Sequence, residues 1–314
     1  MFLLTLIALL PLCITGSNVQ FYQFIADNPV PLNNDYSTLH ATSKTYFIVH
    51  GWTENGLKDE YILMAQNYQA LDATANIILV DYKDLAAQSY LQARQIVNTA
   101  GTEMGTQIVA MLDANALFLT NIHFFGHSLG THVAGQAAQV IKNRTGNKVP
   151  RISASDPAGP LFRSLIIFGF LDPLQKTVTD FLDVTHTSYL MGTIIPFGHV
   201  DTYVQLETIN QPECMGKFDM DSILWCSHRS ARSYFSESIL SCGLRQRRFL
   251  LGVNSILSFV IRLLISFNLN LTDLFVDPEF DVYGQHMSLD QEGVYFMSVN
   301  AESPFGKFDE NCIA

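Results

Sequence analysis

Residues 121–141 read NIHFFGHSLGTHVAGQAAQVI, and this stretch decides the fold. The apolar run at 121–125 predicts a strand, and apolar residues at near-helical spacing predict a helix over 131–141. Between them stands Gly-x-Ser-x-Gly at 126–130, which in this context is the pattern of a nucleophile elbow. Its glycines leave room for a turn that strains the serine backbone and exposes the hydroxyl. We therefore expect Ser128 to be a nucleophile; the alternative is a Gly/Ser turn without chemistry.

The alternation of strand and helix extends along the chain. Short apolar runs at 45–50, 76–80 and 181–186 predict strands buried on both faces, which is typical of a parallel sheet. A helix is predicted over 97–112, where apolar residues recur at near-helical spacing. Together with the elbow, these elements predict an α/β-hydrolase fold with a mostly parallel central sheet and helices on both faces. Since no repeat or linker interrupts the chain, a single domain over 18–314 is expected.

Composition argues against two broad classes of protein. The chain has 314 residues, of which 48% are hydrophobic and 15% charged, so it is too apolar for global disorder. Its net charge of −11 and its lack of a basic run argue against a nucleic-acid binder that neutralises phosphates. The mean hydropathy of +0.17 is high for a water-soluble protein, and contact with membranes stays open.

A serine hydroxyl is a weak nucleophile and needs a histidine base that a carboxylate orients. In the α/β-hydrolase order the acid follows the serine, and the histidine follows the acid. Asp156 lies in the Pro/Gly-rich stretch SDPAGP, so a carboxylate at the end of a strand is expected there. A turn-capping aspartate is the alternative.

Position in the chain does not choose the histidine. A disulfide at Cys226 would anchor the loop of His228, two residues later. The histidines beyond the serine are His132, His186, His199, His228 and His286. Of these, His132, His186 and His199 are expected to have structural or packing roles.

The oxyanion of an ester-hydrolysis intermediate needs backbone N–H donors. One is expected from Leu129, directly after the serine, and the other from the loop after an early strand. His50-Gly51-Trp52 ends the predicted strand at 45–50, so the Trp52 N–H is the expected second donor. An ordinary strand-end turn is the alternative for this tripeptide.

Residues 1–12, MFLLTLIALLPL, form an apolar run of signal-peptide length, followed by small residues suited to cleavage. The run is too short to cross a bilayer, which takes about 20 residues. We expect a signal peptide over 1–17 and hence an extracellular protein; a buried N-terminal helix or strand is the alternative. Sequons at Asn143 and Asn270 are candidates for glycosylation.

Cleavage would remove Cys13 and leave four cysteines. An even number in a secreted chain favours disulfides, and four cysteines allow three connectivities. Cys214 and Cys226 are close enough in sequence to close one loop, whereas the pairing of Cys242 with Cys312 stays open.

Several stretches together resemble the secreted pancreatic-lipase family of animals, and in particular its arthropod phospholipase A1-like branch. They are collinear, and their joint agreement from 47 to 306 is more specific than the elbow pattern alone. The stretches are FIVHGWTENG (47–56), GHSLGTHVAG (126–135), SDPAGPLF (155–162), DVTHTSY (183–189), QPEC (211–214), CSHRSARSYFSESI (226–239) and GVYFMSVNAESPFG (293–306).

The resemblance implies a triad of Ser128, Asp156 and His228, with an oxyanion hole at Trp52 and Leu129. It thereby selects the histidine that position left open. It also implies an esterase that needs no cofactor and acts on phospholipid or neutral lipid at a lipid–water interface. Digestive members of the family carry a C-terminal β-sandwich domain, for which this chain ends too soon, so a lone catalytic domain is expected. Related yolk proteins have lost the serine, and a non-catalytic lipid-binding or storage protein is the alternative from another class.

In the family, a disulfide around QPEC and CSH closes the lid loop, which implies that Cys214 pairs with Cys226. Here the two cysteines enclose only 11 residues, and the stretch between His186 and His199 is also short. Short loops accompany phospholipase A1 activity in the family, so release of the sn-1 fatty acid of glycerophospholipids is expected. A triacylglycerol lipase, which accompanies long loops, is the alternative. The lid residues expected to face lipid, or else to pack inward, are Met215, Ile223, Leu224 and Trp225.

Two features depart from the family pattern. Residues 243–276 do not align with it, and a helix there would be a docked helix, a lipid-contacting helix or the product of a gene-model error. Its polar stripe would consist of Asn254, Ser258, Arg262 and Ser266. The acidic residues in the region of the family's calcium site have altered surroundings, so no metal is expected; they are Asp172, Asp180 and Asp183.

Overall fold

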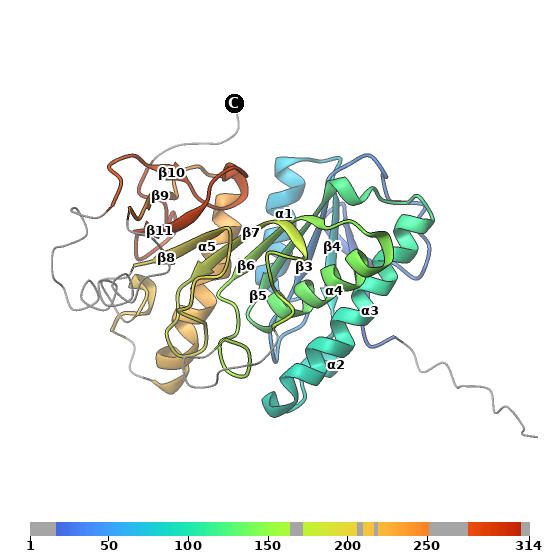
Figure 1. Ribbon diagram of the computed structural model, residues 1–314, viewed down its shortest axis with the longest axis horizontal. Helices are drawn as coiled ribbons and strands as arrows, with labels where there is room; N and C mark the ends of the chain where they lie inside the picture. Colours follow the sequence, from blue (N-terminus) through green and yellow to red (C-terminus); the bar gives the residue numbers. More distant parts are fainter. Residues whose placement is uncertain (1–16, 164–171, 206–209, 217–218, 251–275, 309–314) are drawn as a thin grey trace, which may run out of the picture.

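The computed structural model describes residues 17–163, 172–205, 210–216, 219–250 and 276–308 (Figure 1). Within these ranges, seven neighbouring parallel strands form the centre of one sheet, and antiparallel strands lie at both edges. The parallel strands are β3 (Thr45–Val49), β4 (Asn76–Asp81), β5 (Ile122–His127), β6 (Val149–Ser155), β7 (Thr179–His186), β8 (Val200–Val204) and β11 (Gly293–Met297). The edge strands are β1 (Gln20–Ile25), β2 (Asn28–Pro31), β9 (Arg245–Arg248) and β10 (Asp281–Val282). Their order is β10-β9-β11-β8-β7-β6-β5-β3-β4-β1-β2.

The central strands are covered on both faces, which is why their sequences are apolar without alternation. Every residue of β3, β4, β5 and β8 is buried. Strand β3 lies between β4 and β5, with Thr45 opposite Asn76 on one side and Ile122 on the other. The strands predicted from the four apolar runs are confirmed as β3, β4, β5 and β7.

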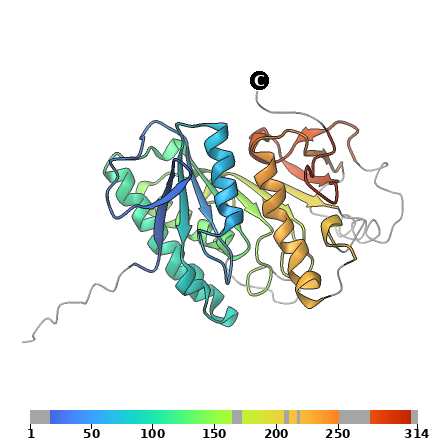
Figure 2. The ribbon, with the colours of Figure 1, turned by 180° about the vertical axis from the view of Figure 1, so that it is seen from behind.

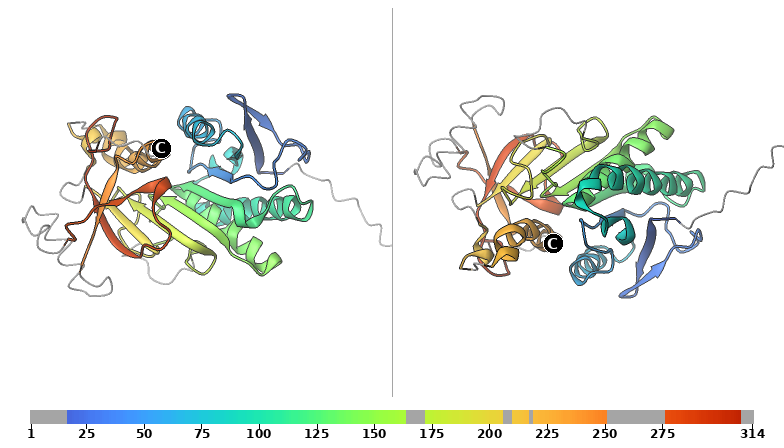
Figure 3. Two further views of the ribbon diagram at one scale, coloured as in Figure 1. Left: turned by 90° about the horizontal axis from the view of Figure 1, so that it is seen from above. Right: turned by 90° about the horizontal axis from the view of Figure 1, so that it is seen from below.

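Helices cover both faces of this sheet (Figure 3). Helices α3 (Ala93–Asp113) and α4 (Leu129–Thr145) lie on one face, and α1 (Asp59–Leu71) and α5 (Ser227–Ser238) lie side by side on the other (Figure 2). Each face has its own apolar core. The helices predicted over 97–112 and 131–141 are confirmed as α3 and α4, both longer at each end. The expected α/β-hydrolase fold, with its mostly parallel central sheet, is thus the observed one.

Short helical segments connect these elements. They are α2 (Lys83–Ala86), the 3-10 turns Tyr90–Gln92, Leu119–Asn121, Pro212–Cys214 and Gly284–His286, and the π-helical turn Ser222–Cys226 directly before α5.

Some expectations fall on residues outside the described ranges. They are the signal peptide except for residue 17, the polar stripe between 254 and 266, and the positions Asn270 and Cys312. Where the unaligned segment 243–276 is described, residues 245–248 form β9, which pairs with β11, and Phe249 bridges Val276. The start of that segment is therefore part of the sheet. No helix in the described ranges has the length and apolar character needed to cross a membrane.

Candidate active site

Ser128 occupies a sharp turn between β5 and α4. Its backbone has φ +54° and ψ −122°, a conformation that costs a residue with a side chain about 1–3 kcal/mol. The Ser128 N–H donates to the Ser155 carbonyl at 3.0 Å, and the Ser128 carbonyl accepts from Thr131 Oγ1 at 2.7 Å. The elbow pattern therefore has the strand, strained turn and helix that it requires.

Gly130 allows this elbow to approach the end of β3. A Cβ atom built on Gly130 would lie 2.3 Å from the His50 carbonyl oxygen, so no larger side chain fits. The first turn of α4 consequently lies against the loop after β3. Leu129 is the first residue of α4, and N–H groups at such positions have no acceptor within the helix. The two expected oxyanion donors, Leu129 and Trp52, belong to these two adjoining turns.

Asp156 and His228 form a buried pair. His228 Nδ1 lies 2.6 Å from Asp156 Oδ2, and because a carboxylate only accepts, Nδ1 carries the proton and Nε2 is left as an acceptor. Asp156 Oδ1 accepts the backbone N–H groups of Thr187 at 2.9 Å and of Ser188 at 3.2 Å. Asp156 is fully buried directly after β6, and His228 is 2% exposed at the start of α5. Backbone donors thus fix the carboxylate, and the carboxylate fixes the imidazole.

One cavity brings most of the predicted site residues together. It has a volume of about 330 Å³ and is lined by Ser128, His228 and Trp52, as well as by Trp225. The Trp225 ring lies 5.9 Å from the His228 ring and 6.2 Å from the Trp52 ring. A larger cavity of about 790 Å³ lies between α1, α5 and residues 303–308, and no predicted catalytic residue lines it.

The other histidines downstream of Ser128 have hydrogen-bond partners elsewhere. His132 contacts Asp172 Oδ1 at 2.8 Å and the Ala158 carbonyl at 2.9 Å, as expected for a structural residue. His186 contacts Asp201 at 2.9 Å. His199 accepts the N–H of Leu182 through Nδ1 at 2.9 Å, and His286 contacts the Ile239 carbonyl at 2.9 Å.

The three acidic residues considered for a calcium site do not converge. Asp172 binds Arg163 as well as His132, Asp183 binds Arg151, and Asp180 is exposed near Lys148. Burial favours the neutral form of Asp172, but the His132 and Arg163 contacts outweigh it and lower its pKa. Over the described ranges, no group of three or more histidine, cysteine or acidic side chains is arranged to hold a metal ion.

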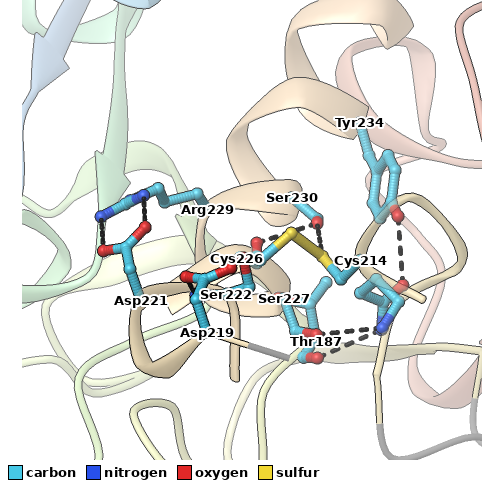
Figure 4. Close-up of a disulfide and its surroundings, with 11 residues drawn as sticks. Thr187, Cys214, Asp219, Asp221, Ser222, Cys226, Ser227, Arg229, Ser230 and Tyr234 are labelled. Carbon is cyan, nitrogen blue, oxygen red and sulfur yellow. Dashed lines mark hydrogen bonds and ion pairs between the residues drawn. A yellow bond between two sulfur atoms is a disulfide. The ribbon is translucent and has the colours of Figure 1, made fainter. Parts of the chain in front are cut away.

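The lid segment is closed by the disulfide Cys214–Cys226 (Figure 4). The pairing that the family resemblance implies is therefore present. Two N–H groups of Arg229 donate to the two carboxylate oxygens of Asp221, each at 2.9 Å, across the end of the lid. Met215 is 59% exposed. Leu224 and Trp225 are half-buried, Trp225 lines the cavity, and the side chain of Ile223 is not described.

Charged residues of the cavity were not foreseen from the sequence. Glu54, Lys58, Asp221 and Arg229 line it beside Ser128. Arg229 directly follows His228, and Glu54 lies three residues after Gly51. The only sequence signal for these residues is that they lie near the motif residues. Charged residues near a turn are common on any protein surface, so their place in the cavity cannot be assigned without the fold.

Fold and site define the class of the protein as α/β hydrolase. A family model described as Lipase matches residues 11–249, and the chain belongs to this lipase family. It is 32% identical over 219 residues to the lipoprotein lipases of Homo sapiens, Bos taurus and Mus musculus, an overlap that covers 64% of this chain and 44% of each relative. The chain thus spans less than half the length of these relatives.

Among solved structures, an α/β hydrolase enzyme from a Medee basin deep-sea metagenome library is similar to this chain. The similarity covers 57% of this chain and 68% of that one, with a TM-score of 0.38 and 17% sequence identity.

Proposed function

We propose that this chain is a serine esterase that hydrolyses carboxylic esters of lipids. Ser128 is the nucleophile, His228 the general base and Asp156 the carboxylate that orients it. The observation that carries the proposal is the 2.6 Å contact of His228 Nδ1 with Asp156, which leaves His228 Nε2 free in the cavity that Ser128 lines.

The chemistry follows from this arrangement. Nε2 of His228 takes the Ser128 proton as Oγ attacks the ester carbonyl, and Asp156 stabilises the resulting imidazolium. The N–H groups of Leu129 and Trp52 bind the developing oxyanion. The alcohol leaves with the proton from His228, and water then releases the fatty acid from the acyl-enzyme by the same steps.

The proposed substrate is a glycerophospholipid, cleaved at its sn-1 ester as by a phospholipase A1. Two features support a polar head group. The lid that the disulfide closes is short, with 12 positions separating its cysteines, which leaves the cavity accessible from its rim. Lys58 and Arg229 line the same cavity, where they pair with Glu54 and Asp221. A head-group phosphate that displaced these carboxylates would gain cationic partners, whereas a triacylglycerol has no anion that could do so.

The protein is further proposed to act outside the cell. The disulfide Cys214–Cys226 fits an oxidising compartment. Asn143 is exposed near the end of α4, where a glycan would be accessible to solvent.

The test compares wild type with Ser128→Ala on vesicles of phosphatidylcholine and on emulsified triolein. Wild type should release fatty acid faster from phosphatidylcholine, and Ser128→Ala should retain the circular-dichroism spectrum but lose hydrolysis. Unchanged hydrolysis by Ser128→Ala would refute the nucleophile. A preference for triolein would replace the substrate assignment by a triacylglycerol lipase, and failure of an organophosphate to label Ser128 would indicate a storage or lipid-binding protein.

A further inference from the structure

Glu54 joins three segments that carry the proposed catalytic groups. Its carboxylate accepts the backbone N–H of Gly51 at 3.1 Å, in the oxyanion loop after β3. It also forms an ion pair with Arg232, one helical turn after His228 on α5. Its Oε2 lies 3.4 Å from Nδ1 of His127, the residue before the nucleophile. A single side chain thus contacts a near neighbour of each proposed catalytic element.

The Glu54 carboxylate is largely buried and has several donors. The Tyr61 hydroxyl donates to it at 2.5 Å, and Lys58 Nζ lies 3.2 Å away. Burial favours the neutral acid, but the hydrogen bond and charge of His127, the charge of Arg232 and the Tyr61 hydroxyl outweigh it. They hold the pKa of Glu54 far below its ordinary value. Glu54 is therefore an anion at neutral pH, fixed in place from several directions.

His127 lies between this anion and the general base. Its Nε2 lies 3.0 Å from the backbone carbonyl oxygen of His228. Because a carbonyl oxygen only accepts, Nε2 carries a proton. The two imidazole rings lie 4.9 Å apart, and His127 is 2% exposed. The donor on His127 therefore fixes the backbone from which the general base extends.

Gly51 brings the oxyanion loop to the same point. A Cβ atom built on Gly51 would lie 3.1 Å from Glu54 Oε2, 3.1 Å from Ser128 Cβ and 3.3 Å from His127 Nδ1. The loop backbone thus lies close to the nucleophile and the Glu54 carboxylate, and an added methyl group at Gly51 would press on both. A shift of Glu54 would be transmitted to the oxyanion loop directly.

We propose that Glu54 and His127 are positioning residues of the esterase. Glu54 fixes the oxyanion loop through the Gly51 N–H and pairs with Arg232 on α5, while His127 fixes the backbone of His228 through its Nε2–H. The imidazole and the oxyanion donors thereby keep their distances from Ser128. The inference deepens the proposed function and rests on it, since these groups need mutual alignment only if Ser128 attacks an ester. Misplacement of a catalytic group by about 1 Å can cost about 100-fold in rate. The second residue of Gly-x-Ser-x-Gly thereby has a role of its own.

His127→Phe tests the donor, because it keeps an aromatic ring and removes the N–H. On short-chain phosphatidylcholine we expect kcat to fall about tenfold or more. KM should stay within twofold of wild type, since His127 does not bind the lipid. His127→Gln, whose amide can donate to the same carbonyl, should recover most of the lost kcat. A purely structural role would lower the yield of folded protein but not kcat per labelled Ser128.

His123→Phe is the matched control. His123 lies near the opposite end of the same strand, is buried, contacts Ser153 Oγ at 2.8 Å and does not line the cavity. This variant should keep kcat within twofold of wild type. Equal losses of kcat in His123→Phe and His127→Phe, or a His127→Phe kcat within twofold of wild type, would overturn the proposal.

A second readout does not depend on turnover. The proton in the 2.6 Å hydrogen bond between His228 and Asp156 should give a downfield NMR resonance. It should shift or broaden in His127→Phe and stay unchanged in His123→Phe. If wild type neither hydrolyses lipid nor reacts with an organophosphate, the proposed function fails, and an unchanged resonance in His127→Phe then overturns the positioning role separately.

Discussion

Gly192 lies against the carboxyl group of Asp156 so closely that an added Cβ atom would stand 2.4 Å from Asp156 Oδ1. Gly192 belongs to the loop after β7 and forms an antiparallel bridge with Ala158, two residues after Asp156. The loops after β6 and β7 are thereby held together around the carboxylate. This contact explains why a glycine is required at a position with no chemistry of its own.

Replacing Gly192 by alanine should reduce kcat about 100-fold, because the added methyl group displaces the carboxylate that orients His228. Hydrolysis of a soluble short-chain ester measures the effect. Gly146→Ala is the control, since Gly146 has φ +77° and no atom within 4 Å of the added Cβ. It should cost about 1–2 kcal/mol of stability, because a residue with a Cβ atom is strained in the left-handed region, and leave kcat unchanged. Equal kcat values in the two variants would contradict the role assigned to this contact.

Arg229→Gln should weaken selection of phospholipid. The variant removes a cation from the cavity beside His228, so kcat/KM on phosphatidylcholine should fall about fivefold, as for a partly exposed ion pair of roughly 1 kcal/mol. Hydrolysis of triolein should change less than twofold. Arg144→Gln, an exposed substitution on α4, serves as the control. A parallel loss on both lipids would show that Arg229 acts through the lid rather than through the head group.

Loss of the lid disulfide should lower the stability of the fold but largely preserve the rate of ester hydrolysis. Replacing Cys214 and Cys226 by serine opens a loop of 12-residue separation, and the free energy of unfolding should fall by about 2–4 kcal/mol. His228 is still held by Asp156, so hydrolysis of a soluble ester should stay within threefold of wild type. Urea unfolding and initial rates on the soluble ester measure the two quantities. A stable but inactive double variant would contradict this separation.

Acid should destabilise the protein through its buried histidines. Burial, followed by the charges of Arg151 and Lys44, holds the pKa of His123 well below its ordinary value of 6.5. Below pH 6.5 this histidine therefore binds a proton in the unfolded chain but stays neutral in the folded chain. The free energy of unfolding consequently decreases as the pH falls, by at most about 1.4 kcal/mol per pH unit for one such group. The pKa of His127 is lowered by burial despite Glu54, and it acts in the same direction.

His123→Phe should flatten this dependence between pH 6.5 and 5, because the variant has no group to protonate at that position. Urea unfolding of wild type and variant at pH 7.5, 6.5 and 5 measures the two slopes. Identical slopes would mean that His123 takes up its proton in the folded state.

The central strands could be predicted because burial on both faces imposes an unbroken apolar run. Strand β6 shows why others could not. It reads VPRISAS, and its polar residues Arg151 and Ser153 can be buried because Asp183 accepts from both and backbone carbonyls of residues 284 and 285 accept from Arg151. Helix α5 is similar, since SHRSARSYFSES resembles a loop by composition and is ordered by tertiary contacts. When buried polar residues bind partners that are distant in sequence, the local sequence does not show that the segment is buried.

The candidate site, like the fold, could be predicted from the sequence only where the signal is local. Ser128 stands within a local turn that glycine spacing reveals, and Asp156 stands at a strand end. The choice of His228 depends on α5 returning to the sheet beside β6, which no spacing in the chain encodes. The resemblance to a family supplied that choice, while the network around Glu54 emerged only from the packed structure.

The parallel order of the strands has a consequence for folding. Thr45 pairs with Ile122, and Val200 pairs with Gly293, so the sheet closes through contacts between distant parts of the chain. Such pairings form slowly because long loops must close first. The oxyanion loop, elbow, acid and base come from four segments that meet only through these pairings. An incompletely folded molecule therefore has no assembled site of the proposed kind, so the proposed hydrolysis would begin only when the whole sheet has formed.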